Sequence, residues 1–409
     1  MLSKILNQSM IKIESETYLS VFIIIAAMLN FLAGINIDMY APSMPAIAHY
    51  FSVSYATVKS TIAINIFGWS MGCIIFGAFI DAFGRKPVII FGLFGYTIAS
   101  LIAIDSHTFF EFYSMRFLQG FMVSTVTIGC RTLIIDRVIG NRYAIAMLYA
   151  SLAYSCGAVF GPFIGGTLQT HFGWQENFIM FAIVAFILFF AMFIMIDESI
   201  SEKQPLFINK IFLNYLNILK NKSFVAGVFV VTLSNIELML YPTIGPFIVE
   251  NKMHFSAGIY GETALIVSTG YLSGTLLCRY LLRFMSSENI YRVAFFILLS
   301  AVLIAWIFYF VASLNLWTLL PPMIMLNITV GLITPNIIGA NLKLMPNCAG
   351  IAMAIQVAMW AFLTAVGIFI VSHATMNNLF HLAMMYFIFV FLQWVVYFQW
   401  YRRCNDEHI

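Results

Sequence analysis

The ten residues GAFIDAFGRK (77–86) decide the fold, because they place charge between two apolar runs that are each long enough to cross a bilayer. Asp81 and Arg85 cannot lie in hydrocarbon without partners, so the segment must be a tight loop at a membrane face. Gly84 allows the turn, and Pro87 prevents the preceding helix from continuing. The stretch is therefore the connection between two membrane-spanning helices.

The composition of the whole chain agrees with this interpretation. Of its 409 residues 62% are apolar and only 9% are charged, against about 25% in an ordinary soluble domain, so a water-soluble core is excluded. The apolar runs are too long and alternate too poorly for barrel strands, and the first is too long for a cleaved signal peptide. We predict an all-α membrane protein with twelve spans, near residues 18–40, 55–80, 87–104, 110–131, 143–167, 177–196, 223–249, 257–281, 290–312, 316–339, 347–371 and 378–401.

The basic residues set the expected orientation. With the N-terminus inside, seventeen of the twenty Lys and Arg residues lie at cytoplasmic ends or loops. Lys59 and Lys252 fall outside, and Arg116 remains within the membrane. Both termini should therefore be cytoplasmic.

A charged segment, 197–222, divides six spans from six. Apolar residues recur in it at helical spacing, so we interpret it as an amphipathic linker on the inner membrane surface rather than as a binding element. The expected organisation is a six-helix bundle over residues 1–196, the linker over 197–222, and a second six-helix bundle over 223–409.

Several classes of site are not expected. The six cysteines fall in spans or on the cytoplasmic side, and none has metal-ligand spacing with a second Cys or a His, so we expect neither disulfides nor a metal site. No basic stripe interleaved with aromatic residues indicates nucleic acid. No HExxH motif, His-Asp cluster, Ser-Lys pair or cofactor loop lies within the spans, which disfavours a membrane enzyme, and the tails are too short for the signalling domain of a receptor.

Further stretches carry specific patterns: DMYAPSMP (38–45), RFLQG (116–120), RTLIIDR (131–137), GAVFGPFIGG (157–166), GLITPN (331–336) and AGIAMA (349–354). Together with residues 77–86 and the arrangement of six plus six spans, they resemble the major facilitator superfamily, and within it the drug/proton antiporter branch and its Bcr/CflA-like subfamily. The signature loop departs from the family pattern at Ala82, where a basic residue is common. The resemblance implies two bundles that rock about a central site in a bacterial inner membrane.

The signature loop is interpreted as a conformational latch at the cytoplasmic gate. It would pair with a facing helix N-terminus, near Asn347, when that side is closed, whereas the alternative is that its cations only anchor the loop inside. The corresponding place in the second half lacks an acid, so we expect an asymmetric latch. The latch residues are Gly77, Asp81, Gly84, Arg85, Lys86, Arg131 and Asp136.

The fifth-span motif consists of Gly157, Gly161, Pro162, Gly165 and Gly166. Glycines four residues apart form one smooth stripe that lets a neighbouring helix approach closely, and the proline permits a bend. The resemblance to antiporters implies a gating helix, and the alternative is plain helix packing.

Ionisable side chains within spans are the best indicators of a transport pathway, because they are costly in a bilayer unless they face a cavity or a partner. Asp38 and Glu237 are the predicted proton-coupling residues, with a helix-capping role as the alternative for Asp38. Arg116 should line a central cavity through a polar stripe with Gln119 and Ser124, unless it is a structural tie within its bundle. The predicted cavity residues are Asn30, Asn65, Arg116, Gln119, Ser124, Tyr149, Tyr154, Tyr241, Asn336 and Gln356.

We therefore predict a proton-coupled antiporter that exports small amphipathic or cationic compounds by alternating access. The alternative is a transporter of the same fold that is dedicated to one metabolite or siderophore, in either direction. The expected partners are membrane lipid, a small-molecule substrate and protons, with no cofactor besides the coupling protons, and the chain is expected to act as a monomer.

Overall fold

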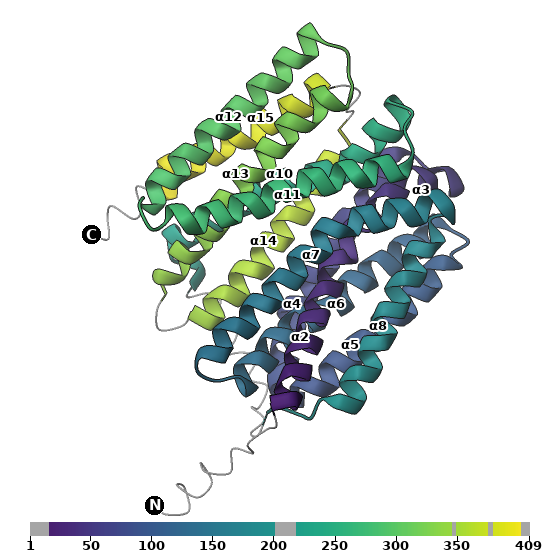
Figure 1. Cartoon of the computed structure of the whole chain (residues 1–409), viewed down its shortest axis with the longest axis vertical. Helices are drawn as coiled ribbons and strands as arrows, with labels where there is room; N and C mark the ends of the chain where they lie inside the picture. Colours follow the sequence, from purple (N-terminus) through teal and green to yellow (C-terminus); the bar gives the residue numbers. More distant parts are fainter. Residues whose placement is uncertain (1–15, 201–217, 346–348, 375–378, 402–409) are drawn as a thin grey trace, which may run out of the picture.

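The computed structural model describes residues 16–200, 218–345, 349–374 and 379–401. These residues fold into helices, with no strand among them (Figure 1). The first half contains α2 (Glu16–Asp38), η1 (Ala41–Ser43), α3 (Met44–Tyr50), α4 (Tyr55–Phe83), α5 (Arg85–Ile104), α6 (Phe109–Arg137), α7 (Asn141–His171) and α8 (Gln175–Met195). The second half contains α10 (Lys222–Pro246), η2 (Phe247–Lys252), α11 (Ala257–Leu281), α12 (Ser287–Val311), α13 (Leu316–Lys343), α14 (Ala349–Ser372), α15 (Leu379–Val395) and η4 (Val396–Tyr401).

The prediction of an all-α membrane protein with twelve spans is confirmed. Eleven helices of the described residues are long and apolar enough to cross a membrane. The twelfth, α11, has 25 residues and packs against α7 and α13. The main local difference from the prediction is the short η1–α3 segment after the first span. Pro42 and Pro45 lie in the first turns of η1 and α3, where a missing N–H costs little.

The boundaries of the helices follow from local chemistry. A single residue, Gly84, separates α4 from α5, and its φ of 113° is a conformation that glycine adopts far more readily than other residues. The Ser54 hydroxyl accepts a hydrogen bond from the Thr57 N–H at the start of α4. Thr108 and Glu111 form a reciprocal capping box at the start of α6. The signature loop is thus a one-residue turn between two long helices, α4 and α5.

The helices pack as two groups (Figure 1). Helices α2 and α4 to α8, drawn from purple to teal, contact one another, and helices α10 to α15, drawn from green to yellow, do the same. The main contacts between the groups join α7 to α11 and α4 to α14. Most of the predicted linker, residues 201–217, lies outside the described residues.

The two groups meet most closely at one end. We call the end of the helices with Arg85, Arg137 and Lys222 the basic end. Near the opposite end, Gly166 of α7 lies against the backbone of α11, and the Thr170 hydroxyl accepts a hydrogen bond of 2.9 Å from the Gly258 N–H. Toward the basic end the facing helices expose apolar side chains, including Leu148 on α7 and Leu276 on α11, which are 48% and 57% exposed. The space between the groups therefore widens toward the basic end.

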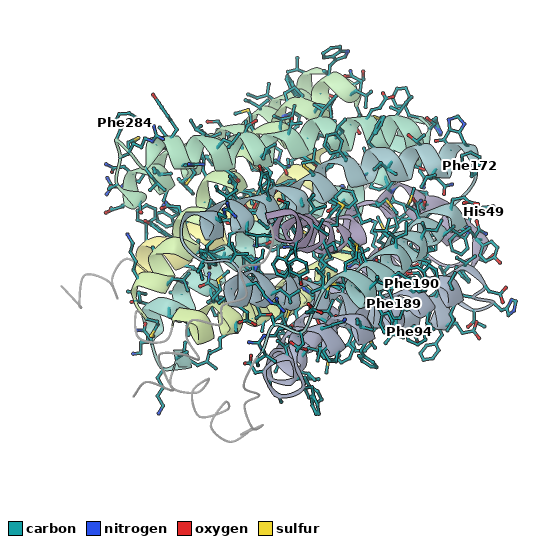
Figure 2. All side chains as sticks on the ribbon, turned by 60° about the horizontal axis from the view of Figure 1, so that its bottom comes forward. His49, Phe94, Phe172, Phe189, Phe190 and Phe284 are labelled. Carbon is teal, nitrogen blue, oxygen red and sulfur yellow. The ribbon has the colours of Figure 1, made fainter. Side chains whose placement is uncertain are left out.

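The outer surface of the molecule is apolar. Phe94 of α5 lies beside Phe189 and Phe190 of α8, with the Phe94 and Phe189 ring centroids 6.0 Å apart (Figure 2). Phe94 is 54% exposed and Phe190 is 44% exposed. Exposed aromatic rings on neighbouring helices are suited to contact with lipid chains, which is the expected environment of these helices.

Candidate functional site

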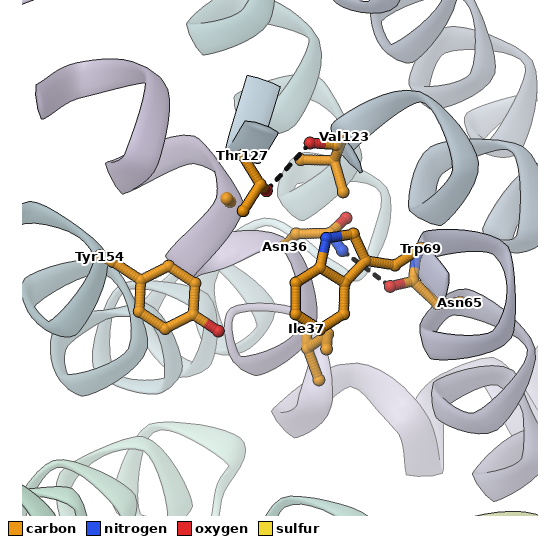
Figure 3. A pocket seen from close by; sticks show the side chains of 8 residues that line it. Asn36, Ile37, Asn65, Trp69, Val123, Thr127 and Tyr154 are labelled. Atoms are coloured by element: carbon orange, nitrogen blue, oxygen red, sulfur yellow. Dashed lines mark hydrogen bonds between the residues drawn. The ribbon is translucent and has the colours of Figure 1, made fainter. Parts of the chain in front are cut away.

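A small hollow lies among four helices of the first helical group (Figure 3). It contains about 270 Å³ of empty space, part of which is open to solvent. The volume that the centre of a water molecule can reach is only about 20 Å³, so in this conformation the hollow has room for about one water molecule. Its lining residues are Ala33, Asn36 and Ile37 of α2, Asn65 and Trp69 of α4, Val123 and Thr127 of α6, and Tyr154 of α7.

Asn36 is the centre of the polar network behind the hollow. The Asn36 side-chain amide donates a hydrogen bond of 2.7 Å to the side-chain oxygen of Asn65. The side-chain oxygen of Asn36 accepts a hydrogen bond of 3.0 Å from the Tyr96 hydroxyl. The Asn65 amide in turn donates to the backbone oxygen of Arg116. These bonds fix two amide side chains at the wall of the hollow. Sequence reasoning identified Asn65 but missed Asn36, although a lone amide in an apolar span was a usable signal.

Arg116 lies inside its own helical group and does not line the hollow. Its side chain is fully buried, and the guanidinium carbon lies 3.9 Å from the centroid of the Tyr40 ring. Its N–H groups donate to the Gln119 side chain and to the backbone oxygen of Asn36. The Gln119 amide donates to Ser100 of α5. These contacts match the alternative interpretation of Arg116, in which it is a structural tie within its own bundle.

Ser124, the third residue of the predicted stripe, also lies at a helix seam. It is fully buried, its hydroxyl donates to the backbone oxygen of Phe121, and it packs against Gly72 of α4. The stripe on α6 thus holds α2, α4 and α5 together. The face of α6 that borders the hollow is the one with Val123 and Thr127.

Asp38, the last residue of α2, lies where α2 meets α7. Its Cβ is close to the position that a side chain at Gly161 would occupy, and the residue is 8% exposed. It forms no hydrogen bond or ion pair with any described residue. Asp38 is therefore a buried acid without a partner among the described residues, and it directly follows Ile37, which lines the hollow.

Glu237 has a different environment. It is 1% exposed within the second helical group, and neither carboxyl oxygen has a hydrogen-bond partner among the described residues. The Tyr386 hydroxyl of α15 donates to its backbone oxygen over 3.3 Å. The two predicted proton-coupling residues thus lie in separate places, one beside the hollow and one inside the opposite bundle.

The other predicted cavity residues are scattered. Tyr154 lines the hollow, and Tyr149, five residues earlier on α7, is 54% exposed. Asn30 is buried between α2 and α6, where its amide donates to the Cys130 sulfur. Tyr241 is 2% exposed, and its hydroxyl donates to Thr263 of α11.

Two amides predicted for the second half of the cavity face helix seams. The Asn336 amide donates to the backbone oxygen of Ser287 at the start of α12. The Gln356 carbonyl oxygen accepts a bond of 3.5 Å from the Asn341 amide and is fully buried. Both residues therefore connect helices within the second group.

Three of the latch residues, Asp81, Arg85 and Asp136, form an ion-pair network within the first group. The Arg85 guanidinium pairs with Asp81 over 2.5 Å and with Asp136 over 3.0 Å. A side chain at Gly77 would meet nothing within 4 Å, so the neighbouring space is open. The partner expected near Asn347 lies outside the described residues.

Glu198, just after α8, is a further member of this network that sequence reasoning missed. Its carboxylate accepts bonds from the backbone N–H groups of Arg85 and Lys86, at 2.9 and 3.2 Å. The same carboxylate therefore caps the N-terminus of α5, where the helix dipole favours negative charge. An acid directly after a predicted span was the only available sequence signal.

The fifth-span glycines have two different contacts. A side chain at Gly157 would collide with the backbone of α2 at Phe31, and one at Gly165 would collide with the backbone of Met39, directly after α2. Gly166 instead faces α11, and the Pro162 carbonyl of the same helix lies against Gly261. The stripe therefore allows α7 to approach a helix of its own group on one face and a helix of the second group on another.

Twelve helices in two groups, a small hollow in the first group and an unpartnered buried acid next to one of its lining residues are features of a membrane transporter. The family model described as Major Facilitator Superfamily matches residues 26–368, so the chain belongs to that family. It is therefore a transporter and not an enzyme.

The similar proteins include several drug-resistance transporters. The chain is 27% identical to the bicyclomycin resistance protein homolog of Haemophilus influenzae, over 59% of each chain. It is 24% identical to the chloramphenicol resistance protein CraA of Acinetobacter baumannii, over 60% of each chain. The matched part thus spans less than two thirds of these relatives. The resemblance to drug-resistance members of the family is confirmed.

Solved structures share the fold. A D-xylose-proton symporter superposes with a TM-score of 0.72 at 15% identity, covering 93% of this chain and 97% of that one. A bacterial homologue of the lysosomal transporter Spinster, solved in an inward-facing and unoccupied conformation, superposes with a TM-score of 0.69 at 14% identity, covering 87% and 82%. At these identities the likeness concerns the fold alone.

Proposed function

We propose that this chain is a proton-coupled antiporter that exports small amphipathic compounds, including cationic ones, from a bacterial cell across its inner membrane. The names of the drug-resistance relatives support export, and the position of Asp38 supports proton coupling. The coupling ion is the proton, no further cofactor takes part, and the monomer is the working unit.

The membrane orientation follows from the charges. The basic end faces the cytoplasm, because loops rich in Lys and Arg remain on that side. The space between the helical groups widens toward this end, while α7 and α11 touch at the opposite end. This arrangement corresponds to an inward-facing state, in which the hollow receives substrate from the cytoplasm.

The observation that carries the proposal is the isolated carboxyl group of Asp38 at the edge of the hollow. An ionised carboxylate there attracts a positive or hydrogen-bond-donating group of the substrate. When a proton binds, this attraction is lost, so proton and substrate compete for one group. Such competition is what links proton entry to substrate exit.

Glu237 is not assigned this role. Its oxygens are fully buried and have no hydrogen-bond partner among the described residues, so a negative charge there would lack a compensating partner from them. We expect Glu237 to keep its proton throughout the cycle, whereas Asp38 exchanges its proton with each transport event.

The test uses purified protein in proteoliposomes with an imposed pH gradient and a panel of amphipathic compounds. Asp38→Asn should abolish uphill transport while substrate exchange down its own gradient persists. Glu237→Gln is the matched control, because it makes the same acid-to-amide change away from the hollow, and it should retain uphill transport. Uphill transport by Asp38→Asn at the wild-type rate would show that the proposal is wrong.

A further inference from the structure

One basic side chain at the end opposite the basic end, here called the outer end, is buried. Lys59 lies one turn after the start of α4 and is only 6% exposed, whereas Lys252 at the same end is exposed. A buried lysine usually has an acidic partner. Among the described residues, however, no ion pair or hydrogen bond involves the Lys59 side chain. Its burial therefore depends on another kind of contact.

The contact that Lys59 does form joins the two helical groups. Its ammonium nitrogen lies 5.0 Å from the centroid of the Phe247 ring, which belongs to the first residue of η2 and is 7% exposed. The ring of Tyr55, one turn before Lys59 on α4, lies with its centroid 4.8 Å from that of the same ring. The face of an aromatic ring attracts a cation, and the attraction grows when water is excluded. A cation and a ring of the first group thus hold one ring of the second.

The acid on the same segment does not take the place of this ring. Glu250 follows Phe247 by three residues, and its Oε1 atom is buried without a hydrogen-bond partner among the described residues. Breaking a buried ion pair is strongly unfavourable, whereas a cation–π contact is weak enough to be broken and formed again in each transport cycle. The contact between Lys59 and Phe247 therefore has a strength that suits a reversible closure.

The position of Lys59 along α4 makes it sensitive to motion of the two groups. The Ser70 hydroxyl of α4 donates a hydrogen bond of 2.8 Å to the backbone oxygen of Ala358 on α14. Lys59 precedes Ser70 by eleven residues, which is about 16 Å along the helix. A rotation of about 15° about the Ser70 contact would move Lys59 about 4 Å away from Phe247. The ammonium group would then lie beyond the reach of about 6 Å over which a ring attracts a cation.

We propose that Lys59 and Phe247 form the outer gate of this transporter, and that their contact holds the outer end closed. In the inward-facing arrangement the ammonium group lies over the ring and blocks the path between α4 and the second group. In the outward-facing arrangement the two residues separate, and water surrounds the ammonium group. This inference goes beyond the proposed function, because it depends neither on the compound that is carried nor on proton coupling.

The experiment measures distances between pairs of spin labels by pulsed electron paramagnetic resonance, on the cysteine-free full-length chain in lipid nanodiscs. The outer pair is Phe172→Cys with Trp317→Cys, and the inner pair is Ile139→Cys with Phe284→Cys. These side chains are 72%, 85%, 70% and 71% exposed, so the labels leave the helix packing intact. Each pair joins the two groups, and Phe172 and Phe284 lie at opposite ends of the molecule (Figure 2). The ratio of long to short outer distances then reports how often the outer end is open.

Four single variants separate the charge from the packing. Lys59→Met and Phe247→Leu each remove the cation–π contact, and both should raise the ratio of open to closed outer ends by about five- to thirtyfold. Lys59→Arg keeps a cation over the ring and should stay within about twofold of wild type. Lys252→Met is the matched control, because it removes an exposed lysine from the same segment as Phe247, and it should also stay within about twofold. The double variant of Lys59→Met with Phe247→Leu should open no further than either single variant, since one contact can be lost only once.

Three results would overturn the inference: a wild-type ratio in Lys59→Met, an equal opening in Lys59→Arg and Lys59→Met, or additive effects in the double variant. The inner pair serves as the check on folding, because an outer end that opens by rocking should shorten the inner distances. If Lys59→Met does not fold, Phe247→Leu tests the same contact from the second group, and a wild-type ratio there overturns the inference equally. Failure of proton-coupled export has a separate signature in the uphill transport by Asp38→Asn and leaves these distances unchanged.

Discussion

The fifth-span glycines allow a graded test of how closely α7 must approach α2. At Gly157 an added methyl group would lie 2.6 Å from the Phe31 carbonyl oxygen and 2.9 Å from the Ile35 nitrogen, both of which are backbone atoms that cannot rotate away. At Gly161 the nearest atom is 3.2 Å away. At Gly339, an exposed glycine of α13, an added methyl would meet nothing within 4 Å.

The magnitude follows from these distances. A carbon normally approaches a carbonyl oxygen to about 3.3 Å, so Gly157→Ala requires α2 and α7 to separate by about 0.7 Å. Separation of this size forfeits about a quarter to a half of the dispersion energy at each contact across the seam. Overpacking of this kind costs about 1 to 3 kcal/mol.

The matched control cancels the intrinsic preference of helices for alanine. Gly339→Ala gains about 1 kcal/mol from helix propensity and incurs no clash. Gly157→Ala gains the same amount, so the difference in stability between the two variants isolates the overpacking cost of about 1 to 3 kcal/mol. Gly161→Ala should fall between them, because its neighbour needs to move by only a few tenths of an ångström.

The assay is thermal unfolding of the three purified variants in one detergent, followed by tryptophan fluorescence and by the loss of monodisperse protein. The expected order of melting temperature is Gly339→Ala, then Gly161→Ala, then Gly157→Ala. If Gly157→Ala melts at or above the temperature of Gly339→Ala, then close packing of α7 on α2 does not explain the glycine stripe.

Two further predictions concern residues that hold the first bundle together. Arg116→Lys should destabilise the protein by about 1 to 3 kcal/mol, because lysine cannot both stack on Tyr40 and donate to Gln119 and the α2 backbone, and thermal unfolding should show the loss without a change in substrate preference. A shifted substrate profile would instead place Arg116 at the binding site. Glu198→Gln should cost about 0.5 to 2 kcal/mol by weakening the cap on α5, and salt should reduce the difference; a loss that salt leaves unchanged would contradict the electrostatic cap.

Most of the fold could be predicted from the sequence. Runs of apolar residues of the length of a bilayer identify the spans, because a backbone in hydrocarbon must satisfy its hydrogen bonds within a helix. The turn at Gly84 could also be predicted, because charged residues and a glycine lie next to one another between two apolar runs. The short η1–α3 segment was not predicted, because two prolines close together usually indicate an irregular loop.

The candidate site was only partly predictable. Asp38, Asn65 and Tyr154 were identified and lie at the hollow or at its edge. Arg116 was also singled out as costly in a membrane, but cost alone does not say whether the compensating partner is a cavity or a neighbouring ring such as that of Tyr40. Asn36 was missed because an amide carries no charge to attract attention in an apolar run.

The sequence by itself determined that this chain is a helical membrane protein, how many spans it has and where its ionisable residues stand along them. The tertiary structure alone decided which neighbour each helical face meets. A membrane helix can be apolar on every side, so the pattern of its apolar residues does not show which face packs against the protein. A small rotation of the helix moves a residue between lipid, a helix–helix contact and the hollow. For that reason two acids that look alike in the sequence, Asp38 and Glu237, differ in space: one borders the hollow without a partner, and the other is enclosed within its bundle.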